Sequence, residues 1–311
     1  MILTVTPNVA LDITYRVDQL TPGSSHRVRQ VEERAGGKGV NVARALQALG
    51  LDTMVLGLVG GANAGAITTD LARGGLVHEL VTVEGPTRRS IAVVDAGSGE
   101  ATLFNEAGPP APAERWNDLE AILAARLPQA AAMVVAGSLP PGSGDDACAR
   151  LVRLAAAHGV TVLVDTVGEA LLRAAEAGAD IVKQNAGELL RTTGRADAAA
   201  GATALRRRGA NAVVVSLGAA GMTASTPEGS WRAAPPARIA GNPTGSGDAA
   251  SAALVAGAVA GAPWPDRLRD AVALSAAAVL QPTAGRVDLR DYRDLVNRIL
   301  VEEQHAPGPD N

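Results

Sequence analysis

Short runs of aliphatic and β-branched residues recur along this chain, and they constrain its fold more than any other feature. Each run is apolar on both faces of an extended strand, as strands inside a parallel sheet are. The clearest runs lie at 55–59, 133–136, 160–165, 181–182 and 213–216. Stretches of helical length, such as 147–158 and 199–208, separate several of them. The alternation predicts a three-layer α/β/α sandwich around a mostly parallel central sheet.

Two segments in the first third of the chain have a different pattern. Residues 11–31 and 90–104 alternate polar and apolar side chains, which is typical of half-exposed antiparallel strands. We therefore expect a small antiparallel β lid, with strands drawn from about 11–33 and 88–105, beside the main sheet. The crevice between such a lid and an α/β core is a suitable place for a substrate.

The charge balance and the scarcity of aromatic and thiol side chains exclude several functional classes. Lys and Arg total 28 against 32 Asp and Glu, so a net charge of −4 provides no basic field for nucleic acid or an anionic membrane surface. Aromatic residues make up 2% of the chain, which leaves few platforms for stacked bases. A single cysteine, Cys148, fits a reducing compartment. With no signal-peptide pattern and no long apolar run, we expect a soluble, cytoplasmic protein.

The first glycine cluster, at 36–39, leads directly into an apparent helix. Glycine allows a ligand to approach the backbone closely, and a helix start presents unpaired N–H groups to an anion or a sugar. Lys38 and Asn41 would add polar side chains there. The segment is not a Walker A loop, because Gly39 follows the lysine where Ser or Thr is needed. A glycine-rich turn with a solvated lysine explains the pattern equally well.

The second glycine cluster precedes an alanine-rich helix. Backbone N–H groups of Gly245–Gly247 at the helix start would stabilise a phosphoryl group in transfer, and Asp248 could accept the proton of an attacking hydroxyl. Alternatively, Asp248 merely caps the helix. The cluster also matches a loose dinucleotide fingerprint, but Pro243 interrupts the strand that should precede it. Residues 142–145 open an apparent helix in a similar way, so the local patterns alone do not assign the base.

A third polar segment, 183–188, follows the apolar pair at 181–182. If a helix begins near Asn185, Glu188 lies one turn further on the same face, and the two could orient a magnesium ion through its waters. The same two residues also fit a capping box, which is a purely structural role. The four histidines lack the close spacing of a zinc site, and no Gly-x-Ser-x-Gly elbow supports a hydrolase.

Together, the segments 36–43 and 244–248 resemble the two signatures of the ribokinase-like (PfkB) carbohydrate kinases. Either one is a weak signal, but both in this order, ~200 residues apart, are specific. The segments 4–12, 87–88, 105–109 and 137–142 are similar to the phosphosugar kinase branch of that family. The resemblance extends from residue 1 to about 285. It implies a single ribokinase-like domain over 1–300, and we expect residues 301–311 to form a frayed tail.

The resemblance implies ATP- and Mg²⁺-dependent transfer of a phosphoryl group to a free hydroxyl of a hexose monophosphate. Fructose 1-phosphate is the favoured acceptor, with tagatose 6-phosphate and fructose 6-phosphate as alternatives. A sugar-phosphate sensor that has lost catalysis is the non-enzymatic alternative, and an NAD-linked oxidoreductase is the other enzyme class. We also expect a homodimer formed through the exposed edge of the lid.

The resemblance further implies roles for individual residues. Asp248 would be the catalytic base, with an anion hole formed by the backbone of Gly245, Ser246 and Gly247. The sugar phosphate would be bound by Asp12, Arg27, Gly37, Lys38, Asn41, Arg88 and Ser138. ATP would be bound by Lys183, Asn185, Ser216, Gly218, Thr244, Gly245 and Gly247. Asn185 and Glu188 would hold magnesium through water.

Two arginines among these residues, Arg27 and Arg88, suit a phosphate dianion, because each offers parallel N–H donors. The sequence departs from the branch at three places near the expected site. Gln184 stands where proline is common, Ser90 stands where asparagine often occurs, and Pro243 and Thr244 stand where serine and valine are usual.

Overall fold

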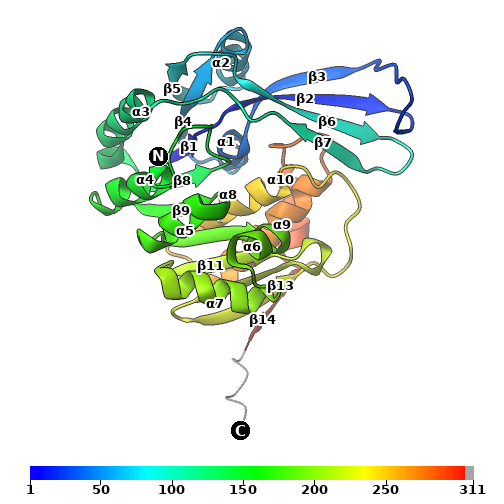
Figure 1. Ribbon diagram of the computed structural model, residues 1–311. Coiled ribbons are helices and arrows are strands. Elements are labelled where there is room, and N and C mark those ends of the chain that lie inside the picture. The colour runs from blue at the N-terminus through cyan, green and yellow to red at the C-terminus, as the bar shows by residue number, and fades with distance from the viewer. Residues whose placement is uncertain (305–311) are drawn as a thin grey trace.

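The larger of two sheets has ten strands among residues 1–304, which are the residues that the computed structural model describes (Figure 1). Its parallel strands are, in spatial order, β5 (Val77–Val83), β4 (Thr53–Gly60), β1 (Ile2–Thr6), β8 (Ala132–Ala136), β9 (Thr161–Asp165), β10 (Ile181–Asn185) and β11 (Ala212–Ser216). The sheet continues beyond β11 with the antiparallel strands β12 (Met222–Thr226), β13 (Gly229–Ala234) and β14 (Leu300–Glu303).

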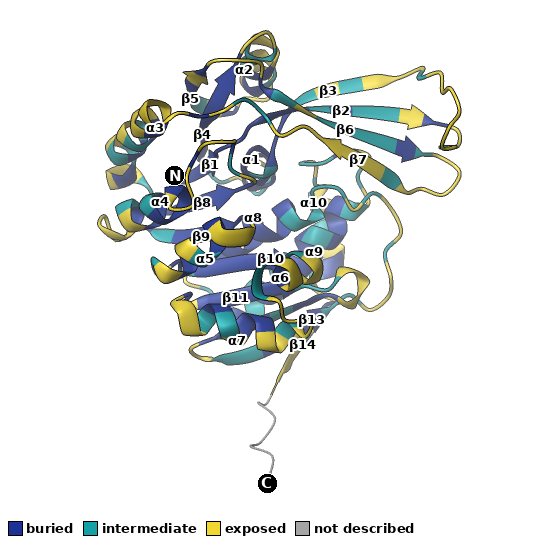
Figure 2. Cartoon of the chain, in the orientation of Figure 1, coloured by how far each residue is buried: buried dark blue, intermediate teal, exposed yellow. Residues whose placement is uncertain are grey.

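Helices cover both faces of this sheet, and Figure 2 shows the strands buried between them. One face packs against α3 (Ala113–Arg126), α4 (Ala147–Ala156), α5 (Gly168–Glu176), α6 (Ala186–Thr193) and α7 (Ala198–Arg208). The other packs against α1 (Lys38–Ala48), α2 (Asn63–Arg73), α8 (Ser246–Val259), α9 (Trp264–Val279) and α10 (Leu289–Val296). The expected three-layer α/β/α sandwich with a mostly parallel sheet is confirmed.

The central parallel strands are buried along their whole length, which explains their continuous apolar sequences. Every residue of β1, β4 and β8 is buried. Successive side chains point to opposite faces and join different apolar cores. In β4, Leu56 packs in the core beneath α3 and α4, whereas Val55 packs in the core shared by α1, α2 and the small sheet.

The small sheet contains β3 (Val31–Gly36), β2 (Ala10–Val17), β6 (Arg88–Asp95) and β7 (Ala101–Asn105), in that spatial order. Its outer pairs are antiparallel, as expected of the lid, but the central strands β2 and β6 pair in parallel. The reason is topological: β2 follows β1 and β6 follows β5, and those two strands run in the same direction in the large sheet. Figure 1 shows the small sheet extending from one end of the sandwich.

The carboxyl-terminal segment corrects one sequence prediction. Residues 301–303 do not fray, because they belong to β14, whose residues 300–303 pair with residues 231–234 of β13. Hydrogen bonding to the open edge of β13 satisfies backbone groups that would otherwise lack a partner in the sheet. Residues 305–311 of the expected tail lie outside the described residues. Among residues 1–304, no helix is long and apolar enough to cross a membrane.

Candidate active site

Two glycine segments that are far apart in the sequence meet where the N-termini of α1 and α8 approach each other. Asn41 of α1 donates a hydrogen bond from Nδ2 to Oδ2 of Asp248, at 2.9 Å, and both side chains are buried. Asp248 does not cap α8. The N-cap position belongs to Gly245, which has a left-handed φ of 82°, and the first turn has no side-chain cap. The carboxylate of Asp248 therefore faces Asn41 across the gap between the two helices.

Burial raises the pKa of Asp248 to about 7. Lys38 opposes this shift by favouring the carboxylate, whereas the negative charge of Asp165 adds to it. A carboxyl group with a pKa near neutrality can accept a proton at physiological pH and release it again. The position and the electrostatics of Asp248 therefore suit a general base.

An ion cluster centred on the buried Asp165 lies beside Asp248 at the carboxyl end of β9. Nζ of Lys38 lies 2.6 Å from Oδ1 of Asp165, and Nζ of Lys183 lies 3.0 Å from Oδ2 of the same carboxylate. Burial by itself would raise the pKa of Asp165, but Lys183 and Lys38 outweigh it and hold that pKa at about 2. Lys38 also contacts Oε1 of Glu188 at 3.1 Å. Asp165 thereby holds the side chains of both lysines in place, and Lys183 lies close to the start of α8.

Asp165 is a residue that the sequence predictions missed. The available signal was its position as the last residue of the apolar run 160–165, since polar residues at the carboxyl ends of parallel strands often form ligand sites. Gly247 completes the arrangement, because a Cβ there would lie 2.6 Å from Nζ of Lys183. The absence of a side chain at this position lets the ammonium group approach the N-terminus of α8.

Asn185 and Glu188 form the capping box that the sequence allowed. Oδ1 of Asn185 accepts from the Glu188 backbone N–H at 2.8 Å, and Oε2 of Glu188 accepts from the Asn185 N–H at 3.0 Å. The preceding Gln184 is fully buried and donates from Nε2 to the carbonyl of Thr166 at 2.6 Å. Gln184 therefore fixes the turn between β10 and α6 by hydrogen bonding, where proline would act by restricting φ.

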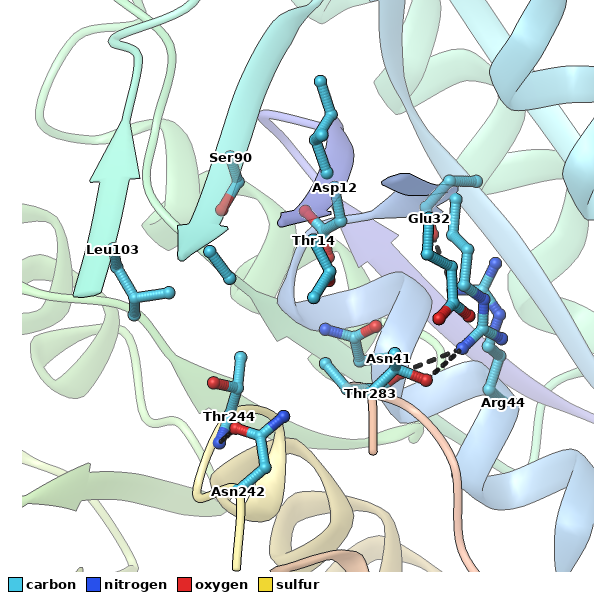
Figure 3. Close-up of a pocket in the computed structure, with 15 residues that line it drawn as sticks. Asp12, Thr14, Glu32, Asn41, Arg44, Ser90, Leu103, Asn242, Thr244 and Thr283 are labelled. Carbon is cyan, nitrogen blue, oxygen red and sulfur yellow. Dashed lines mark hydrogen bonds between the residues drawn. The ribbon is translucent and has the colours of Figure 1, made fainter. Parts of the chain in front are cut away.

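The small sheet forms one wall of a narrow hollow above Asn41 (Figure 3). Asp12 and Ser90 lie on this wall, and Thr244 lies on the opposite side in the loop before α8. Burial raises the pKa of Asp12 to about 6, although Arg88 and Arg44 oppose the shift. The carboxylate leans over the backbone of β3, so that a Cβ at Gly36 would lie 2.0 Å from its Cγ.

Arg88 lies next to this hollow and is linked to Ser138 through Asn8. Its Nε donates to the carbonyl of Asn8 at 3.1 Å, and Nδ2 of Asn8 donates to Oγ of Ser138 at 3.2 Å. Arg27 does not join them. Arg27 is exposed in the loop between β2 and β3, where it lines a separate hollow with His26 and Arg29. The long connection between those strands carries Arg27 away from the site. One chain by itself therefore does not bring Arg27 and Arg88 together as the expected pair for the phosphate.

A second hollow lies on the other side of the α8 N-terminus. Ser216, Gly218 and Gly247 line it, as expected for the nucleotide side. The apolar side chains of four further residues also line it: Met222, Ile239, Val272 and Val279. Thr244 lines the hollow with Asp12 and not this one. The turn at Gly245 reverses the chain between the two hollows, which puts Thr244 on the side of the small sheet.

This chain is similar to known carbohydrate kinases in sequence and in structure. Residues 5–289 match the family model described as pfkB family carbohydrate kinase. A 1-phosphofructokinase of Xanthomonas campestris is 37% identical over 229 residues, which are 70% of this chain and 72% of that protein. A tagatose-6-phosphate kinase of Staphylococcus epidermidis is 33% identical over 171 residues, 55% of this chain and 54% of that protein. The solved structure of a possible 1-phosphofructokinase from Thermotoga maritima has a TM-score of 0.88 at 27% identity, covering 98% of this chain and 100% of that chain.

Proposed function

The chain belongs to the pfkB family of carbohydrate kinases, and from that premise we propose that it transfers the γ-phosphoryl group of ATP to fructose 1-phosphate. As a carbohydrate kinase it is a phosphotransferase with an alcohol group as acceptor. The free C6 hydroxyl of the sugar phosphate would be the acceptor, and the products would be fructose 1,6-bisphosphate and ADP.

The observation that carries the proposal is the buried contact between Asn41 and Asp248 beside the hollow. In the proposed step, Asp248 accepts the hydroxyl proton as the sugar oxygen attacks the γ-phosphorus. The bond from that phosphorus to the bridging oxygen breaks, and ADP leaves with the electron pair. The N-terminus of α8 and the ammonium of Lys183 stabilise the negative charge on the group in transfer. Asn41 holds the carboxylate in position.

The small sheet supplies the proposed contacts to the sugar phosphate. Asp12 would accept hydrogen bonds from sugar hydroxyls, and the guanidinium of Arg88 would pair with the phosphate that the substrate already carries. Burial lowers the pKa of Arg88 while the nearby charge of Asp12 opposes that shift, so Arg88 is a partly desolvated cation close to Asp12. Closure of the small sheet over the substrate would exclude water and protect ATP from hydrolysis.

Magnesium forms a separate part of the proposal. Asn185 and Glu188 offer amide and carboxylate oxygens at the end of β10, and oxygen ligands are those that Mg²⁺ prefers. Among residues 1–304, no group of three or more His, Cys, Asp and Glu side chains could hold a metal ion. This donor set fits an ion held largely by phosphate oxygens and water, with Glu188 reached through water. The ion would neutralise charge on the β- and γ-phosphates of ATP.

A substrate panel tests the proposal. We expect the wild-type protein to use fructose 1-phosphate with a higher kcat/KM than fructose 6-phosphate or tagatose 6-phosphate, with ADP release as the readout. A clear preference for either of the other two would replace fructose 1-phosphate as the substrate and keep the kinase. Binding of these ligands, seen as a rise in melting temperature, without any ADP release would favour the sensor.

We further propose a homodimer formed through the small sheet and a cytoplasmic location. Large apolar side chains are exposed on that sheet, including Val31 at 53% and Phe104 at 56%. Apolar surface beside a sheet edge favours association with a second copy. A monomeric mass at working concentration would contradict the dimer. The buried free thiol of Cys148 supports a reducing compartment.

A further inference from the structure

Three directly paired residues form a row across the small sheet. In the register of the strands, Asp12 of β2 pairs with Arg34 of β3 on one side and with Ser90 of β6 on the other. Directly opposite residues in neighbouring strands point to the same face of a sheet. All three line the narrow hollow above Asn41, where Figure 3 shows Asp12 and Ser90. The row therefore presents a carboxylate between a guanidinium and a hydroxyl.

The guanidinium of Arg34 is incompletely bonded. Its Nη1 donates to Oγ1 of Thr283 at 3.3 Å and to the carbonyl of Ala284 at 3.2 Å. Among residues 1–304, no hydrogen bond uses its Nε or Nη2, and no ion pair includes it. The neighbouring arginines differ, since Arg44 pairs with Asp70 at 2.6 Å and Arg286 with Glu32 at 3.5 Å. Unlike these two, Arg34 has no carboxylate partner among the described residues, and two of its nitrogens keep their donors available.

Asp12 and Arg34 carry opposite charges and face the same hollow, but they form no ion pair with each other among the described residues. Burial and Arg286 lower the pKa of Arg34, while Asp70, Glu32 and Asp12 oppose the shift. A half-buried cation and a half-buried carboxylate that do not touch leave room for a group that accepts from one and donates to the other. Two neighbouring hydroxyls of a sugar have this property, because each hydroxyl is both a donor and an acceptor.

We propose that Arg34 is a specificity-determining residue that donates to one ring hydroxyl of the acceptor sugar while Asp12 accepts from the neighbouring hydroxyl. The C3 and C4 hydroxyls of a hexose ring are such a pair. The inference rests on the proposed function, because it needs a hexose phosphate in this hollow. Inverting either carbon turns one hydroxyl away and leaves a buried polar group unpaired, which a site built for hydrogen bonding rejects strongly.

If Arg34 served only to hold the structure together, its loss should not change the preference between sugar epimers. Arg34 also ties the small sheet to the loop 281–286, and a second arginine makes the same kind of contact. Arg16 of β2 donates from Nη2 to the carbonyl of Pro282 at 3.2 Å, is exposed, and does not line the hollow. Arg16→Ala is therefore a matched control that removes a contact between the sheet and this loop and leaves the hollow intact.

The experiment measures kcat/KM for the preferred hexose monophosphate and for its C3 and C4 epimers. We expect the wild type to prefer the parent sugar phosphate over at least one epimer by tenfold or more. Arg34→Ala should lower kcat/KM for the parent by about 10- to 100-fold and bring the ratio between parent and epimers close to one. Arg34→Lys, which keeps the charge and one donor, should lie between the two, and Arg16→Ala should keep the wild-type ratio.

Several results would overturn the inference: an unchanged ratio in Arg34→Ala, an equal loss for all three sugars, no discrimination by the wild type, or the same loss of discrimination in Arg16→Ala. Melting temperatures check folding, and Arg34→Gln replaces the alanine variant if that protein unfolds. If the wild type phosphorylates no hexose monophosphate, the proposed function fails and the inference with it. Turnover with an unaffected epimer ratio removes the inference alone.

Discussion

The two sheets of this protein differ in how their faces are covered. All residues of β1, β4 and β8 in the large sheet are buried between helices, whereas most residues of β7 in the small sheet are exposed. One face of the small sheet packs Leu11, Ile13 and Ala35 into the core shared with α1 and α2. The other face turns Asp12 and Ser90 toward the hollow.

This difference separates two tasks. The large sheet buries enough apolar surface to hold the fold, and its carboxyl edge fixes the ion cluster and Asp248 in a rigid frame. The small sheet is packed on one face only, and its other face presents polar side chains to the hollow. The following variants test these different roles of the two sheets, from the largest expected effect to the smallest.

Replacement of the proposed base should have the largest effect. Asp248→Asn keeps the size of the side chain but removes the proton acceptor, so we expect kcat to fall by about 10²- to 10⁴-fold. ATP should still raise the melting temperature, because the proposed nucleotide contacts lie on the other side of the α8 N-terminus. Steady-state kinetics and melting with ATP measure both. A near-normal kcat would show that Asp248 is not the base.

Truncation of one leucine in each sheet compares how much the two sheets contribute to the free energy of unfolding. Leu56 of β4 is 0% exposed and Leu103 of β7 is 49% exposed. Leu56→Ala should lower the free energy of unfolding by about 2–5 kcal/mol, because it leaves a cavity in the core. Leu103→Ala should change it by less than about 0.5 kcal/mol. Urea unfolding at one protein concentration measures both, and similar losses would mean that the small sheet contributes to stability as much as the large one.

Variants of two adjacent arginines in β6, Arg88 and Arg89, test the two faces of the small sheet. Arg88 lies close enough to Asp12 to affect the pKa of that carboxyl, whereas the exposed Arg89 is paired with Glu106 at 2.6 Å. Arg88→Ala should raise KM for the sugar phosphate by about 10- to 100-fold with a smaller effect on kcat, because it removes a charged hydrogen-bond donor. Arg89→Ala is the control and should leave KM unchanged. Initial-rate kinetics would remove Arg88 from the phosphate site if its variant kept the wild-type KM.

The pH dependence of the reaction should reflect the raised pKa of Asp248. Burial brings this pKa to about 7, and the deprotonated form is the one that can accept a proton. We expect kcat/KM to reach a plateau above pH 7 and to fall about tenfold per pH unit below it. Asp12, with a pKa of about 6, should steepen the decline at still lower pH. A flat profile down to pH 5 would contradict Asp248 as the titrating base.

The fold and the positions of the glycine segments could be predicted because their signals are local. The apolar composition of a run such as 55–59 indicates a strand that is buried on both faces. A glycine turn before an apolar helix indicates where a ligand can approach the backbone. The antiparallel lid was expected from the alternation in 11–31 and 90–104. The parallel pairing of β2 with β6 was not, because strand direction follows from the order of connections in the large sheet.

The sequence by itself determined the layers of this protein, the glycine-rich helix starts and the candidacy of Asp248. Only the tertiary structure decided which polar groups meet. Asp165 contacts Lys38 across 127 positions of sequence, and Arg34 contacts Thr283 across 249. It also separated Arg27 from Arg88. The physical reason is that periodicity and turn chemistry act between near neighbours in the chain, whereas such contacts depend on the order of strands in a sheet and on the course of the loops that leave it.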